Sequence, residues 1–380
     1  MEKKLINFIE ASIKGDKYKW AKYWKQKGGK VFGIISSYIP EEIIWAGGVF
    51  PFRLRGMWKE NIELARIYRP ENSCDFCTHI LESFLRGELD FLDGLIVGDI
   101  DQDVIRLVDV ILYLKKLNFC HIVHVPFVFT SDIHVQYYAN ELRKLAEKIE
   151  ENTRSEIKEE NIFRSIELYD KLRNLLSSIY EMRKSDQPPL SGEEFLKLML
   201  TVNAMLKNEA IVELEKILPY LYKRKANLKA IYPRVMVLSE DLDNPAYIEL
   251  IENEGCVVVM EDMEMGIRYV DTFPFNEAKD PFYLLAKRYL QKHGSARMGT
   301  WNKQMENILN WVKEFRIDGV IGLLFSWCYP QQYRAPFLQK KLEEKEIPCM
   351  FFDVSYCFSN VAQLKTRIGA FITSLKEKRR

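Results

Sequence analysis

The chain has 380 residues, of which 47% are hydrophobic, and a formal net charge of +1 at pH 7. This length and apolar content are sufficient for two or three domains with buried cores. The near balance of basic and acidic residues argues against nucleic acid as a partner. No apolar run approaches the roughly 18 residues needed to span a membrane, so we expect no membrane partner. Residues 1–15 lack the apolar core of a signal peptide, which predicts a cytoplasmic location.

The first part of the chain alternates predicted strands and helices. Short apolar runs predict strands at 30–36, 49–55, 93–98 and 119–126. Runs with apolar residues at helical spacing separate them, at 40–48, 74–87 and 103–117. Strands that alternate with helices indicate a parallel, doubly wound sheet, and we assign residues 1–150 to an N-terminal α/β domain.

The middle of the chain has a different pattern. Residues 132–228 show helical spacing throughout, with one break at 185–192 that holds two prolines and a glycine. We interpret residues 151–228 as a helical connector, with a separate all-α domain as the alternative. The alternation returns in residues 229–380, which we predict to be a C-terminal α/β domain. The predicted fold class is therefore α/β, with two doubly wound, mostly parallel-sheet domains joined by a helical segment.

The two ends of the chain carry a loosely repeated block. "DGLIVGDIDQD" begins at residue 93 and "DGVIGLLFSWC" at residue 318, and each is a predicted strand followed by a polar loop. Ligands bind at the carboxyl ends of strands in open parallel sheets. If the two units face each other, residues 74–78, 99–103 and 326–330 would line one cleft.

Three of the seven cysteines fall in that predicted cleft. An odd number of cysteines argues against a disulfide framework in a cytosolic chain of this size. Cys74 opens a helix, Cys77 completes a C-x-x-C, and Cys328 follows a strand. Thiolates in such places suit an iron–sulfur cluster, although a single C-x-x-C is weak support for a metal. The other four cysteines include three in apolar strand-like runs, which we interpret as core residues: Cys120, Cys256 and Cys349.

Two polar segments at predicted strand ends are further candidates. Asp99, Asp101 and Asp103 resemble a calcium loop, but the glycine and glutamate of that motif are missing, and a solvated loop is the alternative. Residues 36–44, "SSYIPEEII", place Ser37 and Glu42 at a helix start, where they either cap the helix or contact a substrate. The chain has neither a P-loop motif nor a G-x-G-x-x-G motif, so no nucleotide site is visible.

Several spaced blocks together resemble a known family. The blocks are "GIISSYIPEEIIWAGGVFPFRLRG", "SCDFCTHILESFLRGELDFLDGLIV", "SIELYDKLRNLLSSIYEMRKSDQPPLSG", "RIDGVIGLLFSWCYP" and "IPCMFFDVSYCFSNVAQLKTRIGAFI". In this order they resemble subunits of the 2-hydroxyacyl-CoA dehydratases and benzoyl-CoA reductases, such as the D-component of 2-hydroxyglutaryl-CoA dehydratase. The resemblance covers nearly the whole chain.

The resemblance implies a [4Fe-4S] cluster held by three cysteines of each subunit. It makes Cys74 and Cys328 the first and third ligands and metal-binding residues. The second cysteine of the family falls at Asp101 in this chain. Asp101 would then bind through oxygen, Cys77 would substitute for it, or the cluster would be labile or absent.

The resemblance also implies an activity and partners. It predicts an anaerobic lyase or oxidoreductase that passes one electron from the cluster to an acyl-CoA thioester, with Ser37 and Glu42 near the thioester and its mobile proton. The partners would be a homologous subunit, forming a hetero- or homodimer, and a separate ATP-hydrolysing iron–sulfur activator. Two alternatives are a non-catalytic partner subunit with a degenerate cluster site and a double-cubane-cluster reductase of small molecules.

Overall fold

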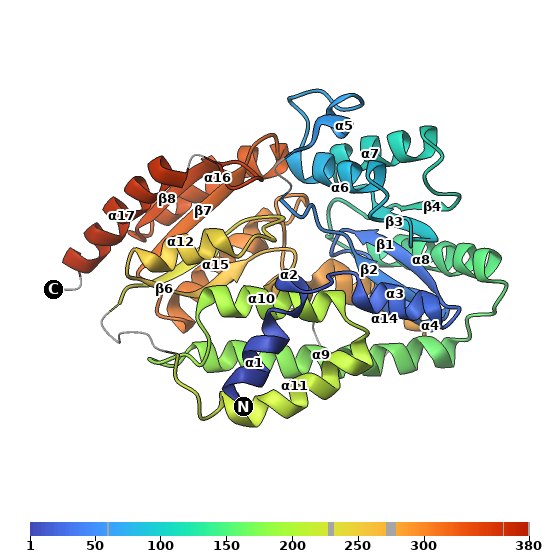
Figure 1. Cartoon of the computed structure of the whole chain (residues 1–380), viewed down its shortest axis with the longest axis horizontal. Helices are drawn as coiled ribbons and strands as arrows, with labels where there is room; N and C mark the ends of the chain where they lie inside the picture. The colour runs from blue at the N-terminus through green and yellow to red at the C-terminus, as the bar shows by residue number, and fades with distance from the viewer. Residues whose placement is uncertain (59–60, 227–231, 271–278, 360, 379–380) are drawn as a thin grey trace.

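Two parallel sheets, each covered by helices, form the protein (Figure 1). The computed structural model describes residues 1–58, 61–226, 232–270, 279–359 and 361–378. Within these ranges, no helix is both long and apolar enough to cross a lipid bilayer.

The first sheet has the strand order β2-β1-β3-β4, and all its neighbouring strands are parallel. Its strands are β1 (Lys30–Ile35), β2 (Val49–Arg53), β3 (Gly94–Gly98) and β4 (Cys120–Val123). Every residue of the inner strand β3 is buried, as expected for a parallel strand covered on both faces. Pro51 lies in β2, an edge strand, where its missing N–H costs least.

The second sheet has the equivalent strand order, β6-β5-β7-β8, and is also parallel throughout. Its strands are β5 (Arg234–Leu238), β6 (Val257–Asp262), β7 (Gly319–Phe325) and β8 (Cys349–Val354). The predicted "DGLIV" and "DGVIG" strands are the inner strands β3 and β7. The predicted fold class, two mostly parallel α/β units, is confirmed.

Four helices lie between the strands of the first sheet in chain order. They are α4 (Glu41–Ala46), α5 (Glu63–Arg66), α6 (Asp75–Leu85) and α7 (Gln102–Tyr113). Those that accompany the second sheet are α12 (Ala246–Asn253), α13 (Ile267–Val270), α14 (Pro281–Gln291), α15 (Trp301–Glu314), α16 (Tyr329–Glu343) and α17 (Val361–Lys378). Helix α14 also packs on α8, so it lies against the first unit (Figure 1).

A layer of helices from the middle of the chain lies beside both sheets (Figure 1). These are α8 (Asp132–Thr153), α9 (Glu159–Arg183), α10 (Gly192–Ala204) and α11 (Lys207–Leu221). Ser191 and Glu194 form a reciprocal capping box that starts α10 after the predicted break. The predicted domain boundary at residues 228 and 229 lies outside the described residues, and the three-part division of the chain stays a prediction.

Three helices at the N-terminus were not predicted. They are α1 (Glu2–Ile9), α2 (Ala11–Lys14) and α3 (Lys19–Gln26). Leu5 and Ile9 of α1 are fully or almost fully buried, and they join the core cluster that includes residues of α9, α10 and α11. The amphipathic N-terminus is therefore part of the folded core.

Candidate functional site at the carboxyl ends of the strands

Two cysteines lie in the first turn of α6. Cys74 is the N-cap residue of this helix, and Cys77 follows one turn later, on the same side. Both side chains are buried. The nearby Cys74 side chain and burial both raise the pKa of Cys77 well above its usual value. The start of α6 therefore favours the protonated form of Cys77.

The third cysteine reaches the same cleft from the second unit. Cys328 is the N-cap residue of α16, directly after β7, and it is also buried. Burial raises the pKa of Cys328 well above its usual value; the Arg297 guanidinium opposes this rise, and the nearby Cys74 sulfur adds to it. Next to Cys328, the hydroxyl of Tyr329 donates a hydrogen bond to the carbonyl oxygen of Asn72 at 3.3 Å, so the two units bring Cys74 and Cys328 to the same region.

Asp101 occupies the corresponding position at the start of α7. As the N-cap residue, it accepts a hydrogen bond through Oδ1 from the backbone N–H of Asp103, at 2.9 Å. Its other oxygen, Oδ2, accepts a hydrogen bond from Nε of Arg297, at 2.7 Å. Both oxygens of this carboxylate are thus engaged, one by its own helix and one by a buried cation from the second unit.

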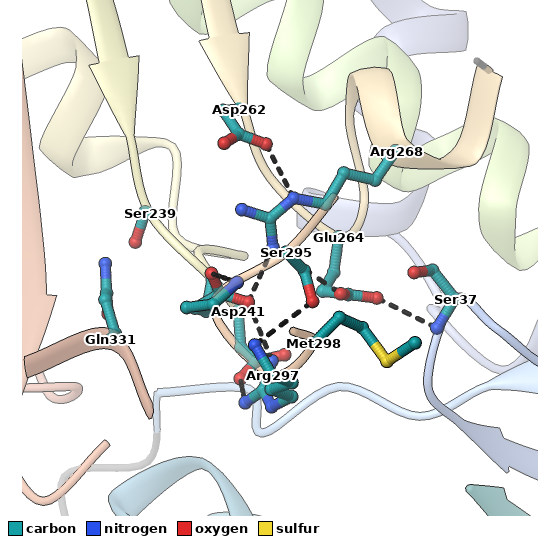
Figure 2. A network of polar contacts seen from close by, with 12 residues as sticks. Ser37, Ser239, Asp241, Asp262, Glu264, Arg268, Ser295, Arg297, Met298 and Gln331 are labelled. Atoms are coloured by element: carbon teal, nitrogen blue, oxygen red, sulfur yellow. Dashed lines mark hydrogen bonds and ion pairs between the residues drawn. The ribbon is translucent and has the colours of Figure 1, made fainter. Parts of the chain in front are cut away.

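Arg297 lies at the centre of the cleft. Its side chain is only 7% exposed, and it comes from the loop between α14 and α15. Besides Asp101, its guanidinium pairs with Glu240 at 3.1 Å and with Asp241 at 2.5 Å, and Nη2 lies 4.0 Å from Sγ of Cys328. The contact with Asp241 is visible in Figure 2. The guanidinium therefore bridges Asp101 on one side and Cys328 on the other.

The ion pairs continue beyond Arg297 into the second unit. Glu240 also pairs with Arg268, at 2.5 Å. Arg268 pairs in turn with Asp262, at 2.6 Å (Figure 2). Glu264 lies beside this network; burial alone would raise its pKa, but Arg268 and other nearby cations lower that pKa to about 2. The network therefore keeps several buried carboxylates paired with two buried guanidinium groups.

A small cavity opens between the two units at this network. Its volume is about 20 Å³, enough for a water molecule but not for a large ligand. The polar side chains that line it belong to both units: Ser36, Asp101, Asp241, Glu264 and Arg297. As folded, the centre of the cleft is filled by side chains.

Ser37 lies next to the network. It is buried, its backbone N–H donates to Oε2 of Glu264 at 2.9 Å, and its carbonyl oxygen accepts from Nζ of Lys292 at 2.5 Å (Figure 2 shows the first contact). Burial lowers the pKa of Lys292 to about 7. Ser37 thus joins the first unit to the second, which is compatible with its predicted position near a substrate but does not test it.

Glu42 is placed differently. It is fully buried, and its two carboxylate oxygens accept hydrogen bonds from Arg173 at 2.6 Å and from the hydroxyl of Tyr289 at 2.7 Å. These partners belong to α9 and α14, so the carboxylate is bonded to the helices beside the sheet. A role as a mobile base would require these two bonds to break, and the predicted role stays a prediction.

The donor set does not fit a [4Fe-4S] cluster as it is arranged. The oxygens of Asp101 are committed to Asp103 and Arg297, and a guanidinium stands beside Cys328. Across the part of the chain that the structure describes, no three His, Cys, Asp or Glu side chains are grouped so that they could hold a metal ion. Ligation by Asp101 through Oδ2 would first require Arg297 to leave this carboxylate.

The structure thus brings together four of the predicted site residues: Cys74, Cys77, Asp101 and Cys328. Sequence reasoning missed the side chains that fill the space between them: Arg297, Glu240, Asp241 and Glu264. Glu240 and Asp241 follow β5 directly, so the same rule that identified Asp101 could have found them. Arg297 lies in a loop without periodic pattern and offered no signal.

Comparison with protein families identifies one family. The profile of the 2-hydroxyglutaryl-CoA dehydratase D-component matches residues 36–375, a range that begins just after β1 and includes the other strands of both sheets, the helical layer and all the cleft residues described above.

Individual relatives agree with this match over almost their entire length. The chain is 25% identical to the (R)-phenyllactyl-CoA dehydratase beta subunit of Clostridium sporogenes, over 98% of this chain and 99% of the relative. It is 23% identical to one of the benzoyl-CoA reductase subunits of Thauera aromatica, over 94% of each. It is also 23% identical to the beta subunit of (R)-2-hydroxyglutaryl-CoA dehydratase of Acidaminococcus fermentans, over 93% of this chain and 94% of the relative. Each of these relatives is one subunit of an enzyme with several.

Proposed function

Because this chain belongs to the 2-hydroxyglutaryl-CoA dehydratase D-component family, we propose that it is the cluster-free subunit of a heteromeric enzyme that dehydrates or reduces an acyl-CoA thioester. In this proposal the [4Fe-4S] cluster belongs to a homologous subunit, and a separate ATP-hydrolysing iron–sulfur activator supplies the electron. This chain completes the assembly in the cytoplasm and shapes the site.

The observation that carries the proposal is the position of Arg297. A buried cation already pairs with Asp101, Glu240 and Asp241 in the cleft where the resemblance puts the cluster. Buried charges are stable only when they are paired, so the arginine and its three carboxylates are expected to be retained together. Replacement of the second cysteine by Asp101 and occupation of the cleft by Arg297 are thus two parts of one arrangement.

An assay of the assembled enzyme tests this proposal. The chain would be co-expressed anaerobically with a homologous subunit and the activator, and assayed with 2-hydroxyacyl-CoA and aromatic acyl-CoA thioesters. We expect activity to require both subunits and to survive Cys328→Ser in this chain, while the matching cysteine substitution in the partner abolishes it. Loss of activity with Cys328→Ser, in an enzyme that still assembles, would contradict the proposal.

A second candidate is the electron-carrying subunit itself. It is favoured by the convergence of Cys74, Cys77 and Cys328 in one cleft, since soft thiolates are what iron–sulfur clusters bind. In that case Asp101→Cys should increase the iron retained by the chain, because a thiolate would replace a weaker oxygen ligand. If the proposal is right, Asp101→Cys alone gains no stable cluster, because Arg297 still fills the cleft.

A further inference from the structure

The outer face of α16 is unusual for a surface helix. Such a helix normally presents polar residues to solvent and apolar residues to the core. The inner face of α16 is buried as expected, through Gln331, Ala335, Leu338 and Leu342. Its outer face carries Tyr333 and Phe337, which are 74% and 59% exposed, and Tyr329 one turn before them. Residues four apart lie on the same side of a helix, so these three rings form one exposed row.

Further aromatic side chains extend this row onto both units. The ring centroid of Trp327 lies 6.3 Å from that of Tyr329, and the ring centroid of Trp301 lies 6.1 Å from that of Phe337. On the first unit, Tyr68 lines the same cavity as Tyr329, and α5 and α16 lie along the same side of the molecule in Figure 1. All of these rings are at least 36% exposed. We call them the aromatic patch, which consists of Tyr68, Trp301, Trp327, Tyr329, Tyr333 and Phe337.

The aromatic patch is large enough to form the centre of a stable interface. A fully buried aromatic side chain removes about 150–250 Å² from solvent, so the exposed parts of the six rings amount to on the order of 500 Å². A standard interface buries about 800 Å² on each partner. The rings alone would therefore supply more than half of what one side of such an interface needs.

The composition of the aromatic patch is also that of an interface core. Aromatic residues are enriched in such cores, while Lys, Glu and Asp are depleted. Residues 327–337 include a single charged residue, Arg334. Its guanidinium donates through Nη2 to the carbonyl oxygen of Met298, at 2.7 Å. The exposed row of α16 therefore offers rings rather than charges to a partner.

We propose that the aromatic patch is the surface that binds the homologous subunit. The inference rests on the proposed function, because that function requires a second, cluster-bearing subunit. The patch borders the cleft: Tyr329 directly follows Cys328, and its hydroxyl contacts the backbone of Asn72, two residues before Cys74. A subunit seated on the patch would contact both units and cover this edge of the cleft.

A permanent subunit fits the aromatic patch better than the activator does. Permanent interfaces are large and hydrophobic, whereas partners that meet to exchange electrons and then separate bury small areas. The relatives are named as single subunits of their enzymes, so a permanent partner is expected for this chain as well. Six exposed rings that span two units match the first kind of contact.

The test is the affinity of the full chain for the homologous subunit, measured anaerobically by titration calorimetry. Tyr333→Ser combined with Phe337→Ser removes the two most exposed rings of the patch. Aromatic hot spots cost at least about 2 kcal/mol when truncated, so we expect Kd to increase at least about 30-fold. The matched control is Tyr222→Ser, since Tyr222 is 66% exposed but lies at the end of α11. Its Kd should stay within about twofold of wild type.

Hydrogen exchange of the wild-type chain gives a second readout that needs no variant. Peptides that cover residues 327–340 should exchange more slowly when the homologous subunit is bound, while peptides of α11 should not change. This measurement decides the matter even if the double variant fails to fold.

Three results would overturn the inference. They are an unchanged Kd in the double variant, no protection of residues 327–340, and loss of a homodimer or of activator binding in place of subunit binding. Iron and sulfide are measured on the same samples, so that the two proposals can fail separately. An iron-loaded chain that binds the subunit through the patch rejects the proposed function alone, whereas an iron-free chain that binds it elsewhere rejects only this inference.

Discussion

Replacement of Arg297 by methionine tests the energetic role of the buried cation. Methionine keeps most of the length of the side chain but removes the guanidinium, leaving Asp101, Glu240 and Asp241 without their shared partner. The four side chains are at most 10% exposed, so solvent cannot screen the loss. Removing one partner of a buried ion pair costs about 3–5 kcal/mol, since it leaves an uncompensated charge.

The expected cost can be expressed as a melting temperature. With about 2.1 cal/mol/K of unfolding entropy per residue, a chain of 380 residues loses about 5 °C for a destabilisation of about 4 kcal/mol. Differential scanning calorimetry of Arg297→Met against wild type measures this shift. The matched control is Arg316→Met, because Arg316 pairs with Asp186 at 2.6 Å but both side chains are more than half exposed. Exposed pairs contribute about 0–1 kcal/mol, so the control should melt within about 1 °C of wild type.

The destabilisation caused by Arg297→Met should also depend on pH. Burial raises the pKa of Asp241 to about 7, although Arg297 opposes this rise. A carboxyl whose pKa is higher in the folded state destabilises the fold as pH increases, and without Arg297 its pKa should rise further. The loss of stability of Arg297→Met relative to wild type should therefore be larger at pH 8 than at pH 6. Equal melting temperatures for Arg297→Met and wild type at pH 8, or equal costs for Arg297→Met and Arg316→Met, would refute this reasoning.

Three further predictions follow from contacts elsewhere in the chain. The His79 imidazole lies 3.7 Å from the Cys357 sulfur and lowers the pKa of that partly exposed thiol, so iodoacetamide should alkylate Cys357 more slowly at pH 7 in His79→Gln; an unchanged rate would exclude the pairing. Gly322→Ala should destabilise by about 1–3 kcal/mol in urea unfolding, because a Cβ would lie 2.1 Å from the ring of Phe351; a neutral result would show that this ring moves freely. Ser191→Ala should cost about 1 kcal/mol through loss of the α10 cap, and no change in the unfolding midpoint would contradict the capping box.

The sheets were predictable because their inner strands are continuous apolar runs between helices. β3 and β7 are buried along almost their whole lengths, and their sequences, "GLIVG" and "GVIGLLF", contain only apolar residues and glycine. The N-terminal helices were missed because α1 shows its apolar face over only two turns. Leu5 and Ile9 of α1 are buried only because helices far along the chain pack against them.

The candidate site was predictable only in part, for a similar reason. Cys74, Asp101 and Cys328 all follow strands or begin helices, so topology alone brings them to one edge. Arg297 reaches that edge from a loop, and its position depends on charge pairing with residues of two other segments. Such pairing leaves no periodic pattern in the sequence, so the filling of the cleft could not be predicted from it.

The most direct test of the cluster-free assignment is the iron and acid-labile sulfide bound per chain after anaerobic reconstitution, with the charge-transfer absorbance recorded on the same sample. We expect the wild-type chain to hold no stoichiometric cluster and to differ little from Cys74→Ala and Cys328→Ala. A full [4Fe-4S] complement in the wild type that is lost in both variants would contradict the account and assign the electron-carrying role to this chain.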